Sequence, residues 1–125
     1  GNLRRSSDKQ QLAANAVELA ENLAAKGIVV ITRRGLMADY ITSCHPQATR
    51  IFAFTNDSQT RRRLMLNRNV SPIRSAFSQD PEKTLTTAFK LLRDKGEIES
   101  GDKVVVISDI LAGAGIDAIQ IRLIP

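Results

Sequence analysis

The sequence predicts an α/β domain in which a mostly parallel, five-stranded sheet lies between two layers of helices, a three-layer αβα sandwich. Three observations predict this class. Short uninterrupted runs of β-branched and apolar residues, such as Ile28–Thr32 and Lys103–Ser108, are typical of strands buried on both faces of a parallel sheet. Segments with apolar residues at helical spacing separate these runs. The length of 125 residues suits one hydrophobic core.

The first helix is expected to begin at a cap formed by Ser7 or Asp8. It should end at Gly27, since a glycine after a lysine is typical of a helix C-terminus. Residues 1–7 are interpreted as a cloning remnant and lead-in, and residues 8–125 as a single domain. One face of the helix is apolar, with residues recurring three or four apart: Leu12, Ala13, Ala16, Val17, Ala20, Leu23 and Ala24.

The remaining elements have ends set by caps and prolines. Pro46 ends one helix, and Asn56 or Asp57 can cap the next. Pro72 restricts its short strand to an edge or an end of the sheet, whereas Pro81 occupies the favoured first position of a longer helix. The expected elements are strand 28–32, helix 36–43, strand 50–55, helix 58–66, strand 70–73, helix 81–96, strand 103–108 and strand 118–124.

The last strand should be antiparallel to the strand before it. The connecting loop, Asp109–Asp117, has about nine residues and no helix, whereas a parallel crossover needs about a dozen or more. Alternation places Ile119, Ile121 and Leu123 on one face of this strand. We expect them at a subunit interface, because an exposed antiparallel edge can pair with its two-fold mate. The alternative is that they pack on the domain's own helices.

Composition excludes several classes of function. The net charge of +5 suits an anionic partner, but aromatic residues make up only 4% of the chain, which argues against base stacking and thus against nucleic acid. No apolar run approaches the ~20 residues of a membrane span. The single cysteine, Cys44, excludes an internal disulfide, and no Cys/His cluster predicts a metal site. We expect a cytoplasmic protein.

The candidate site lies where the first strand ends. Ligands of open α/β sheets gather beyond the carboxyl ends of the strands, where helix N-termini point. There Thr32 offers a hydroxyl, Arg33 and Arg34 two cations, and Gly35 a close backbone approach, a set that suits a phosphate. The alternative is two solvated arginines in a turn that needs glycine for its φ angle. The spacing matches neither the P-loop nor the dinucleotide fingerprint.

No catalytic constellation is evident elsewhere. Cys44 and His45 are adjacent, so their side chains point in different directions, and no carboxylate completes a nucleophilic arrangement. The run Arg61–Arg63 spreads across about 200° of a helix at 100° per residue, so its members cannot all face one ligand. We expect a solvated face or an interface there. The sequence therefore predicts no catalytic residues.

The ordered set of motifs resembles the C-terminal domain of pyruvate kinase. In that family a helix ending Ala-Val-Glu leads into an apolar strand, a Thr-x-x-Gly turn, a helix and an x-x-Pro segment. A second strand then ends in Thr before an Asn-x-x-Thr turn. The resemblance covers residues 8–125. The matching residues here are Ala16-Val17-Glu18, Ile28–Thr32, Gly35, His45-Pro46, Thr55–Thr60, Lys103–Ser108 and Arg122–Pro125.

The resemblance implies a fragment. It implies that phosphoryl transfer, with Mg²⁺ and K⁺, belongs to an N-terminal catalytic barrel of the same chain, and that this fragment alone is inactive and needs no cofactor. It also implies a share in a tetramer interface and an effector site. That site would comprise the turn at residues 32–37 and the loop at residues 109–117, with Gly113 and Gly115, folding over a sugar phosphate such as fructose bisphosphate.

The turn departs from the family pattern. Arg34, Leu36 and Met37 stand where responsive enzymes present small hydroxyl residues or another cation, so the hydrogen-bonding cradle is depleted. Another anionic effector, or none, is therefore as well supported as fructose bisphosphate. The alternative function is a free-standing α/β module that binds a phosphorylated metabolite or a nucleotide at Thr32–Gly35.

Overall fold

The computed structural model describes residues 2–108 and 118–125 and confirms the predicted fold class. Its sheet has the strand order β3-β2-β1-β4-β5, with the first four strands parallel and β5 antiparallel to β4. The elements are α1 (Asn2–Asn22), β1 (Gly27–Ile31), α2 (Leu36–Ser43), β2 (Arg50–Thr55), α3 (Ser58–Leu64), β3 (Val70–Arg74), α4 (Pro81–Asp94), β4 (Lys103–Ser108) and β5 (Ala118–Leu123).

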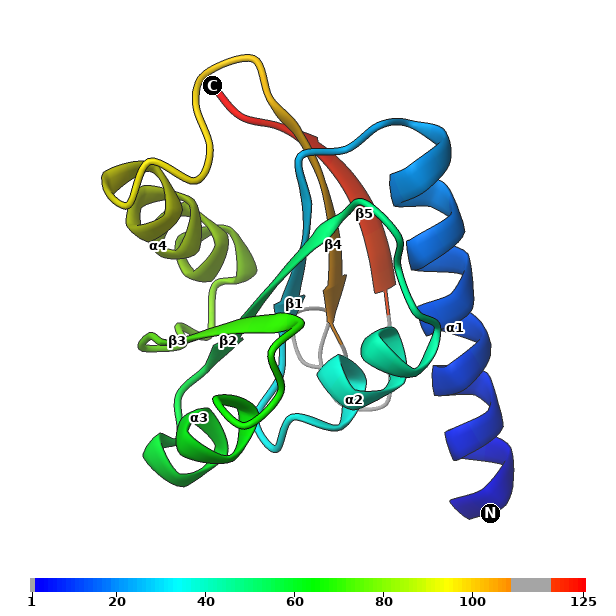
Figure 1. Ribbon diagram of the computed structural model, residues 1–125. Helices are drawn as coiled ribbons and strands as arrows, with labels where there is room; N and C mark the ends of the chain where they lie inside the picture. The colour runs from blue at the N-terminus through cyan, green and yellow to red at the C-terminus, as the bar shows by residue number, and fades with distance from the viewer. Residues whose placement is uncertain (1, 109–117) are drawn as a thin grey trace.

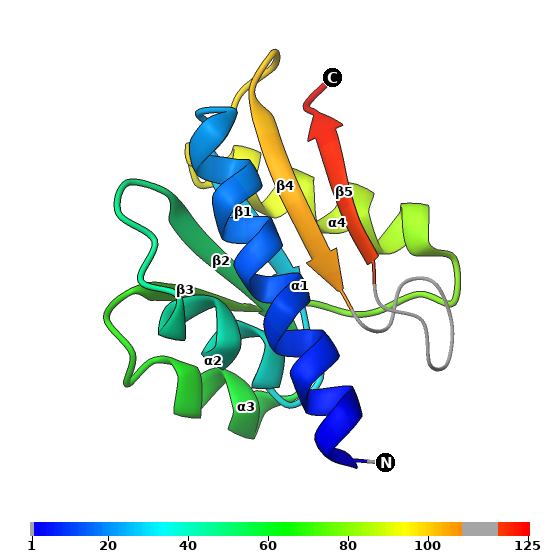
Figure 2. The ribbon, with the colours of Figure 1, turned by 90° about the vertical axis from the view of Figure 1, so that its right-hand side faces the viewer.

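The sheet separates two hydrophobic clusters. Helices α1, α2 and α3 cover one face and α4 covers the other, as Figures 1 and 2 show from two directions. Side chains alternate between the clusters along β1, since Ile28 and Val30 face α1 whereas Val29 and Ile31 face α4. Every residue of β1 is buried, as the apolar run predicts for a central parallel strand.

Helix α1 differs from the prediction at both ends. Helical backbone begins at Asn2 rather than at Ser7 or Asp8, because neither glycine nor proline interrupts residues 2–7. The helix ends at Asn22, and the left-handed residue that reverses the chain is Ala24, with φ of 51°. Gly27 is the first residue of β1. A Cβ there would lie 2.6 Å from Cε2 of Phe52, so the glycine serves close packing.

The other elements begin and end close to where the sequence predicts. Asp57 caps α3 by accepting a hydrogen bond from the amide of Thr60, and Asp80 caps α4 in the same way through the amide of Glu82. Pro81 occupies the first position of α4, and β3, with Pro72, lies at an edge of the sheet. Helix α3 ends at Leu64, two residues before the predicted end.

Strand β5 has two different faces. Ile119 packs against the cluster under α1, whereas Ile121 and Leu123 on the same face are 50% and 67% exposed. On the opposite face Arg122 donates hydrogen bonds of 2.7 and 2.8 Å to the two carboxylate oxygens of Glu82 on α4. This pairing lowers the pKa of Glu82, because the guanidinium stabilises the ionised carboxylate. The strand is thereby fixed to α4, while Ile121 and Leu123 on its other face stay exposed.

Candidate functional site

The site predicted at Thr32–Gly35 lies at the carboxyl ends of β1 and β2. The two strands are parallel neighbours, with Ile31 opposite Phe54, so the turns that follow them meet at one edge of the sheet. The amide of Thr32 donates a 2.9 Å hydrogen bond to the carbonyl of Phe54, which extends the pairing by one residue beyond β1. The first predicted site residue is therefore held by the sheet itself.

Two threonine hydroxyls fix the conformation of the turn. The Thr32 side chain, only 2% exposed, accepts a 2.9 Å hydrogen bond from the amide of Gly35. The buried hydroxyl of Thr55 donates a 3.0 Å hydrogen bond to the carbonyl of Arg33. Gly35 has φ of 87°, a left-handed conformation that favours glycine. The Thr32 hydroxyl therefore braces the turn, with its acceptor role filled by Gly35.

Gly35 is the N-cap residue of helix α2, and no side chain caps the helix there. The amide of Asp39 donates a 3.0 Å hydrogen bond to the carbonyl of Gly35, and this is the first backbone hydrogen bond of the helix. The amides of residues 36–38 precede that bond and so have no acceptor within the helix. Together they carry the positive end of the helix dipole. The start of the helix thus places amides without an intrahelical acceptor, together with partial positive charge, at the predicted site.

Charged groups surround these donors. Arg33 and Arg34 are both exposed, so their guanidinium groups are open to a ligand. Asp57 accepts hydrogen bonds from the hydroxyl and the amide of Thr60, at 2.8 and 3.0 Å. These bonds lower the pKa of Asp57, and the charge of Arg34 lowers it further. Arg34 therefore already faces one anion.

Arg63 of α3 is the residue that sequence reasoning missed. Its Nη2 donates a 2.7 Å hydrogen bond to the carbonyl of Arg34, and its Nη1 lies 3.2 Å from Oδ1 of Asp39. The same guanidinium occupies the space where a Cβ of residue 35 would lie. Because β1 and β2 are parallel neighbours, α2 and α3 start side by side. That adjacency is the signal that could have placed Arg63 at the turn.

Other predicted residues lie elsewhere. Gly113 and Gly115, proposed to close over a ligand, belong to residues 109–117 and fall outside the described residues. Leu36 and Met37 follow the turn as predicted, with Leu36 44% exposed and Met37 buried in the core under α1 and α2. Ile119, Ile121 and Leu123 lie on β5, at the edge of the sheet beyond β4.

Three further features of the described residues bear on function. They contain no group of three or more His, Cys, Asp or Glu side chains that could hold a metal ion. Burial raises the pKa of the Cys44 thiol, which donates a 3.3 Å hydrogen bond to the carbonyl of Tyr40, so the thiol is a poor nucleophile. Within residues 2–108 and 118–125, no helix has the length and apolar character needed to cross a bilayer.

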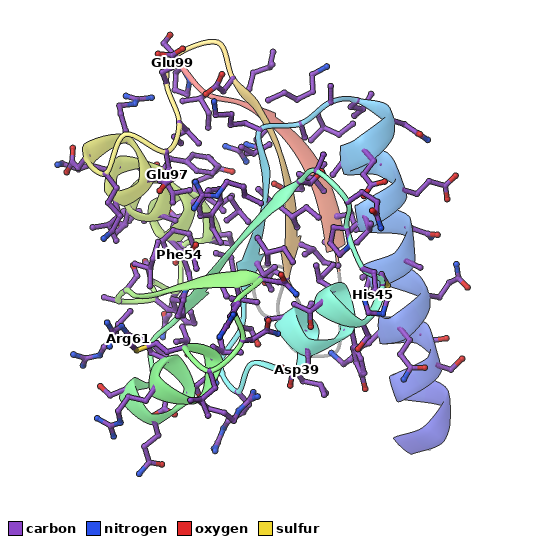
Figure 3. All side chains as sticks on the ribbon, in the orientation of Figure 1. Asp39, His45, Phe54, Arg61, Glu97 and Glu99 are labelled. Carbon is purple, nitrogen blue, oxygen red and sulfur yellow. The ribbon has the colours of Figure 1, made fainter. Side chains whose placement is uncertain are left out.

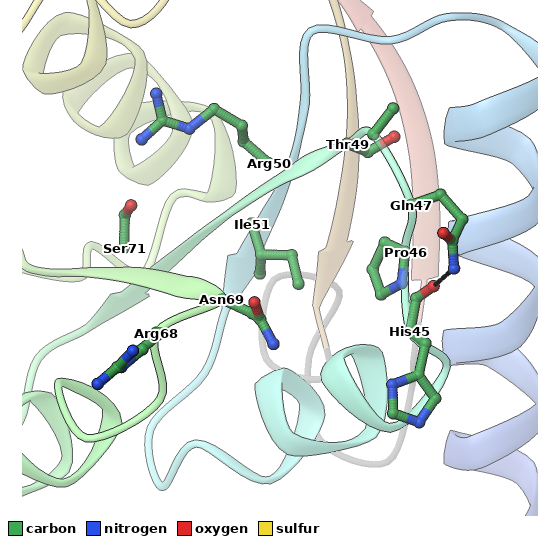
Figure 4. Close-up of a pocket in the computed structure, with 10 residues that line it drawn as sticks. His45, Pro46, Gln47, Thr49, Arg50, Ile51, Arg68, Asn69 and Ser71 are labelled. Atoms are coloured by element: carbon green, nitrogen blue, oxygen red, sulfur yellow. Dashed lines mark hydrogen bonds between the residues drawn. The ribbon is translucent and has the colours of Figure 1, made fainter.

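A basic hollow lies at the opposite end of the strands from this turn. It has a volume of about 480 Å³, and its lining includes His45, Arg50 and Arg68 (Figure 4). The labelled side chains point in different directions, and Arg50 pairs with Glu97 at 2.8 Å. Figure 3 shows Asp39 and Arg61 at the lower end of the domain and Glu97 and Glu99 at the upper end.

Comparison with known proteins identifies relatives of the whole chain. A family model described as the alpha/beta domain of pyruvate kinase matches residues 10–121. The chloroplastic pyruvate kinase isozyme A of Nicotiana tabacum is 36% identical over 119 residues, which are 95% of this chain and 19% of that protein. The corresponding isozyme of Ricinus communis is 35% identical over 125 residues, 100% of this chain and 20% of that protein.

A solved structure supports the same family assignment. The pyruvate kinase of Cryptosporidium parvum in complex with ADP superposes with a TM-score of 0.84 at 26% sequence identity, covering 94% of this chain and 24% of that chain. The chain spans about a fifth of the length of the curated plant relatives described above.

Proposed function

Because the chain belongs to the pyruvate kinase family and corresponds to its alpha/beta domain, we propose that it is the regulatory and oligomerisation domain of a pyruvate kinase. In this proposal a separate barrel domain of the parent chain transfers the phosphoryl group from phosphoenolpyruvate to ADP, with its Mg²⁺ and K⁺. The present chain would bind an anionic effector at the turn Thr32–Gly35 and transmit its presence. By itself it would be inactive.

One observation carries the effector proposal: the uncapped start of α2 faces the same turn that bears Arg33 and Arg34. Free amides at a helix N-terminus and guanidinium groups are both donors to phosphate oxygens, and neither can accept from them. Hydrogen bonds to a charged group each contribute about 1.5–3 kcal/mol, roughly twice the neutral value. The buried hydroxyls of Thr32 and Thr55 keep this arrangement formed before any ligand arrives.

The chemistry of the effector follows from the same residues. Leu36 and Met37 supply no side-chain donor, so recognition of the phosphate would come from backbone amides and arginines. Asp57 lies close enough to Arg34 for the arginine's charge to lower the pKa of Asp57. The ionised carboxylate would repel a second phosphate on that side. We therefore favour a ligand with one phosphate at the turn, whether a sugar phosphate or another phosphorylated metabolite.

Regulation would be a coupling between this site and the active site of the parent chain. An effector stabilises whichever arrangement of domains and subunits binds it more tightly, and the same coupling free energy then acts on substrate affinity. Strand β5 is where subunits would meet. It forms one free edge of the sheet and exposes Ile121 and Leu123, and a two-fold axis can place two such strands antiparallel.

A thermal-shift screen against sugar phosphates, nucleotides and inorganic phosphate at low salt tests the effector proposal. A ligand present at 100 times its Kd should add about 2.7 kcal/mol of stability. Arg33→Ala should weaken binding by about 1.5–3 kcal/mol, which lowers that gain to about 0.3–1.3 kcal/mol at the same ligand concentration. Lys90→Ala, which removes one positive charge from α4 on the other face of the sheet, is the matched control.

Two outcomes of the screen would contradict the proposal. If Arg33→Ala and Lys90→Ala reduce the ligand-induced stabilisation equally, then net charge, and not the turn, attracts the ligand. A ligand whose stabilisation is unchanged by Arg33→Ala would bind elsewhere, and the hollow beside Arg50 and Arg68 would then be examined by the same approach.

The compartment is a separate part of the proposal. The sequence alone suggests the cytoplasm, whereas the relatives from Nicotiana tabacum and Ricinus communis are named chloroplastic. We keep the cytoplasm as the prediction. Fluorescence microscopy of the full parent chain, tagged at its C-terminus, decides between them, and plastid fluorescence would overturn the cytoplasmic prediction.

A further inference from the structure

Arg63 on α3 is directed at the turn that follows β1. The run Arg61–Arg63 is helical, so its three side chains point in directions about 100° apart. Arg63 is the member whose Nη2 donates a 2.7 Å hydrogen bond to the carbonyl of Arg34. Its guanidinium also occupies the space beside Gly35 in which a Cβ would lie. Helix α3 thereby brings a positive charge to the residue that caps α2.

The contacts of this guanidinium leave several of its donors available. An arginine has five N–H donors in one plane. Within residues 2–108 and 118–125, one donor of Arg63 is used by the carbonyl of Arg34 and another faces Oδ1 of Asp39, which lies 3.2 Å from Nη1. The side chain is 49% exposed, so the remaining N–H groups are open to a ligand. Phosphate oxygens are strong acceptors for such groups.

Asp39 is an anion built into the same place. It lies in the first turn of α2, and its side chain is 42% exposed. A carboxylate in the first turn of a helix is stabilised by the positive end of the helix dipole, and here it also pairs with Arg63. Asp39 therefore interacts with the same positive charges that would attract an anionic ligand to the turn.

We propose that Arg63 is a third phosphate-binding arginine of the site at Thr32–Gly35, and that Asp39 is its internal counter-ion and sets how tightly the site holds a ligand. A bound phosphate accepts hydrogen bonds from the open donors of Arg63, so it joins α3 to the turn. The charge of Asp39 offsets that of Arg63 and repels the ligand, which weakens binding. This inference rests on the proposed effector function and deepens it.

A purely structural role for this ion pair makes a different prediction. If Arg63 only braces the turn, a substitution of either partner loosens the same brace, and neither substitution increases the affinity for phosphate. If Arg63 binds the ligand in competition with Asp39, the two substitutions act in opposite directions. Asp39→Asn suits this comparison, because the amide oxygen still offers Arg63 an acceptor while the negative charge is removed.

Titration of the ¹⁵N-labelled chain with inorganic phosphate, at constant low ionic strength, tests the proposal through the amide shifts of residues 35–38. Arg63→Ala should raise the Kd about tenfold or more, as expected for a lost hydrogen bond to a charged group. Arg62→Ala, the matched control, removes the same charge from the neighbouring position of α3 and should change the Kd less than about twofold. Asp39→Asn should lower the Kd about two- to fivefold, the effect of one charge roughly 4–8 Å away in water. Its control, Asp94→Asn, removes an aspartate that pairs with a lysine on α4 and should leave the Kd unchanged.

Failure of this inference and failure of the effector function give different results. If the amides of residues 35–38 respond to phosphate and Arg33→Ala weakens the response, the effector function stands. Equal Kd values in Arg63→Ala and Arg62→Ala, or a Kd that Asp39→Asn raises or leaves unchanged, would then overturn the roles of Arg63 and Asp39 alone. If these amides respond to phosphate neither in the wild type nor in Asp39→Asn, both proposals are overturned. Urea unfolding of each variant confirms that it is folded under the conditions of the titration.

Discussion

Replacing Gly35 by alanine tests the geometry of the turn most sharply. Gly35 has φ of 87°, and a left-handed conformation costs a residue with a Cβ about 1–2 kcal/mol. The added Cβ would also occupy the position of the Arg63 guanidinium, which must then move. Moving it breaks an exposed ion pair with Asp39, worth about 0.2–1 kcal/mol, and a hydrogen bond to the carbonyl of Arg34. We expect Gly35→Ala to cost about 2–3 kcal/mol in total.

A double-mutant cycle in urea unfolding separates the two contributions. In an Arg63→Ala background the steric conflict is absent, so Gly35→Ala should cost only the backbone contribution of about 1–2 kcal/mol. Gly96→Ala is the matched control, because Gly96 has φ of 74° and nothing lies within 4 Å of its missing Cβ. Its cost should be about 1–2 kcal/mol and independent of residue 63.

Two results of this double-mutant cycle would contradict the expected geometry of the turn. An equal cost of Gly35→Ala with and without Arg63 would show that the guanidinium does not lie over the turn. A cost below about 0.5 kcal/mol would show that residue 35 is not left-handed, because a left-handed residue would not accept alanine so cheaply.

Three further predictions concern other parts of the domain. Gly27→Ala should lower stability by about 1–3 kcal/mol, because its Cβ would lie 2.6 Å from the ring of Phe52, and thermal unfolding should show partial recovery with Phe52→Leu. Asp57 has a pKa below its ordinary value, so its ionised form stabilises the fold above about pH 4 and this contribution is lost as pH falls through the lowered pKa. Asp57→Asn should therefore be less stable than wild type at pH 7, with the difference shrinking in acid in pH-dependent melting curves; a constant difference would be contrary. Ile121→Asp should reduce oligomer in sedimentation velocity with little change in melting temperature, since Ile121 is half exposed; a large loss of stability would place the residue in the core.

The sequence predicts much of this fold because its strands are strongly patterned. The apolar run at 28–31 admits only a strand buried on both faces, and Pro81 after Asp80 defines the start of α4 without any tertiary information. The antiparallel direction of β5 followed from the length of a single loop. These signals are local or depend only on the length of one connecting loop, so they can be found in the sequence alone.

The features that escaped prediction depend on contacts between distant residues. Gly27 looked like the end of a helix, but it is the ring of Phe52 on β2 that requires a glycine there. Arg63 looked like one member of a solvated run, yet α3 places it over the turn that follows β1. Leu66 was expected inside a helix and instead follows its end, exposed to solvent. None of these roles has a signature within its own segment.

The central claim is that the start of α2 binds an anion, and amide chemical shifts measure it directly. In a titration of the ¹⁵N-labelled chain with the phosphorylated ligand selected by the thermal screen, the amides of residues 35–38 should shift most and should saturate together. Arg33→Ala should raise the apparent Kd roughly 10- to 150-fold. Shifts centred instead on the hollow at His45, Arg50 and Arg68, with residues 35–38 unmoved, would contradict the account.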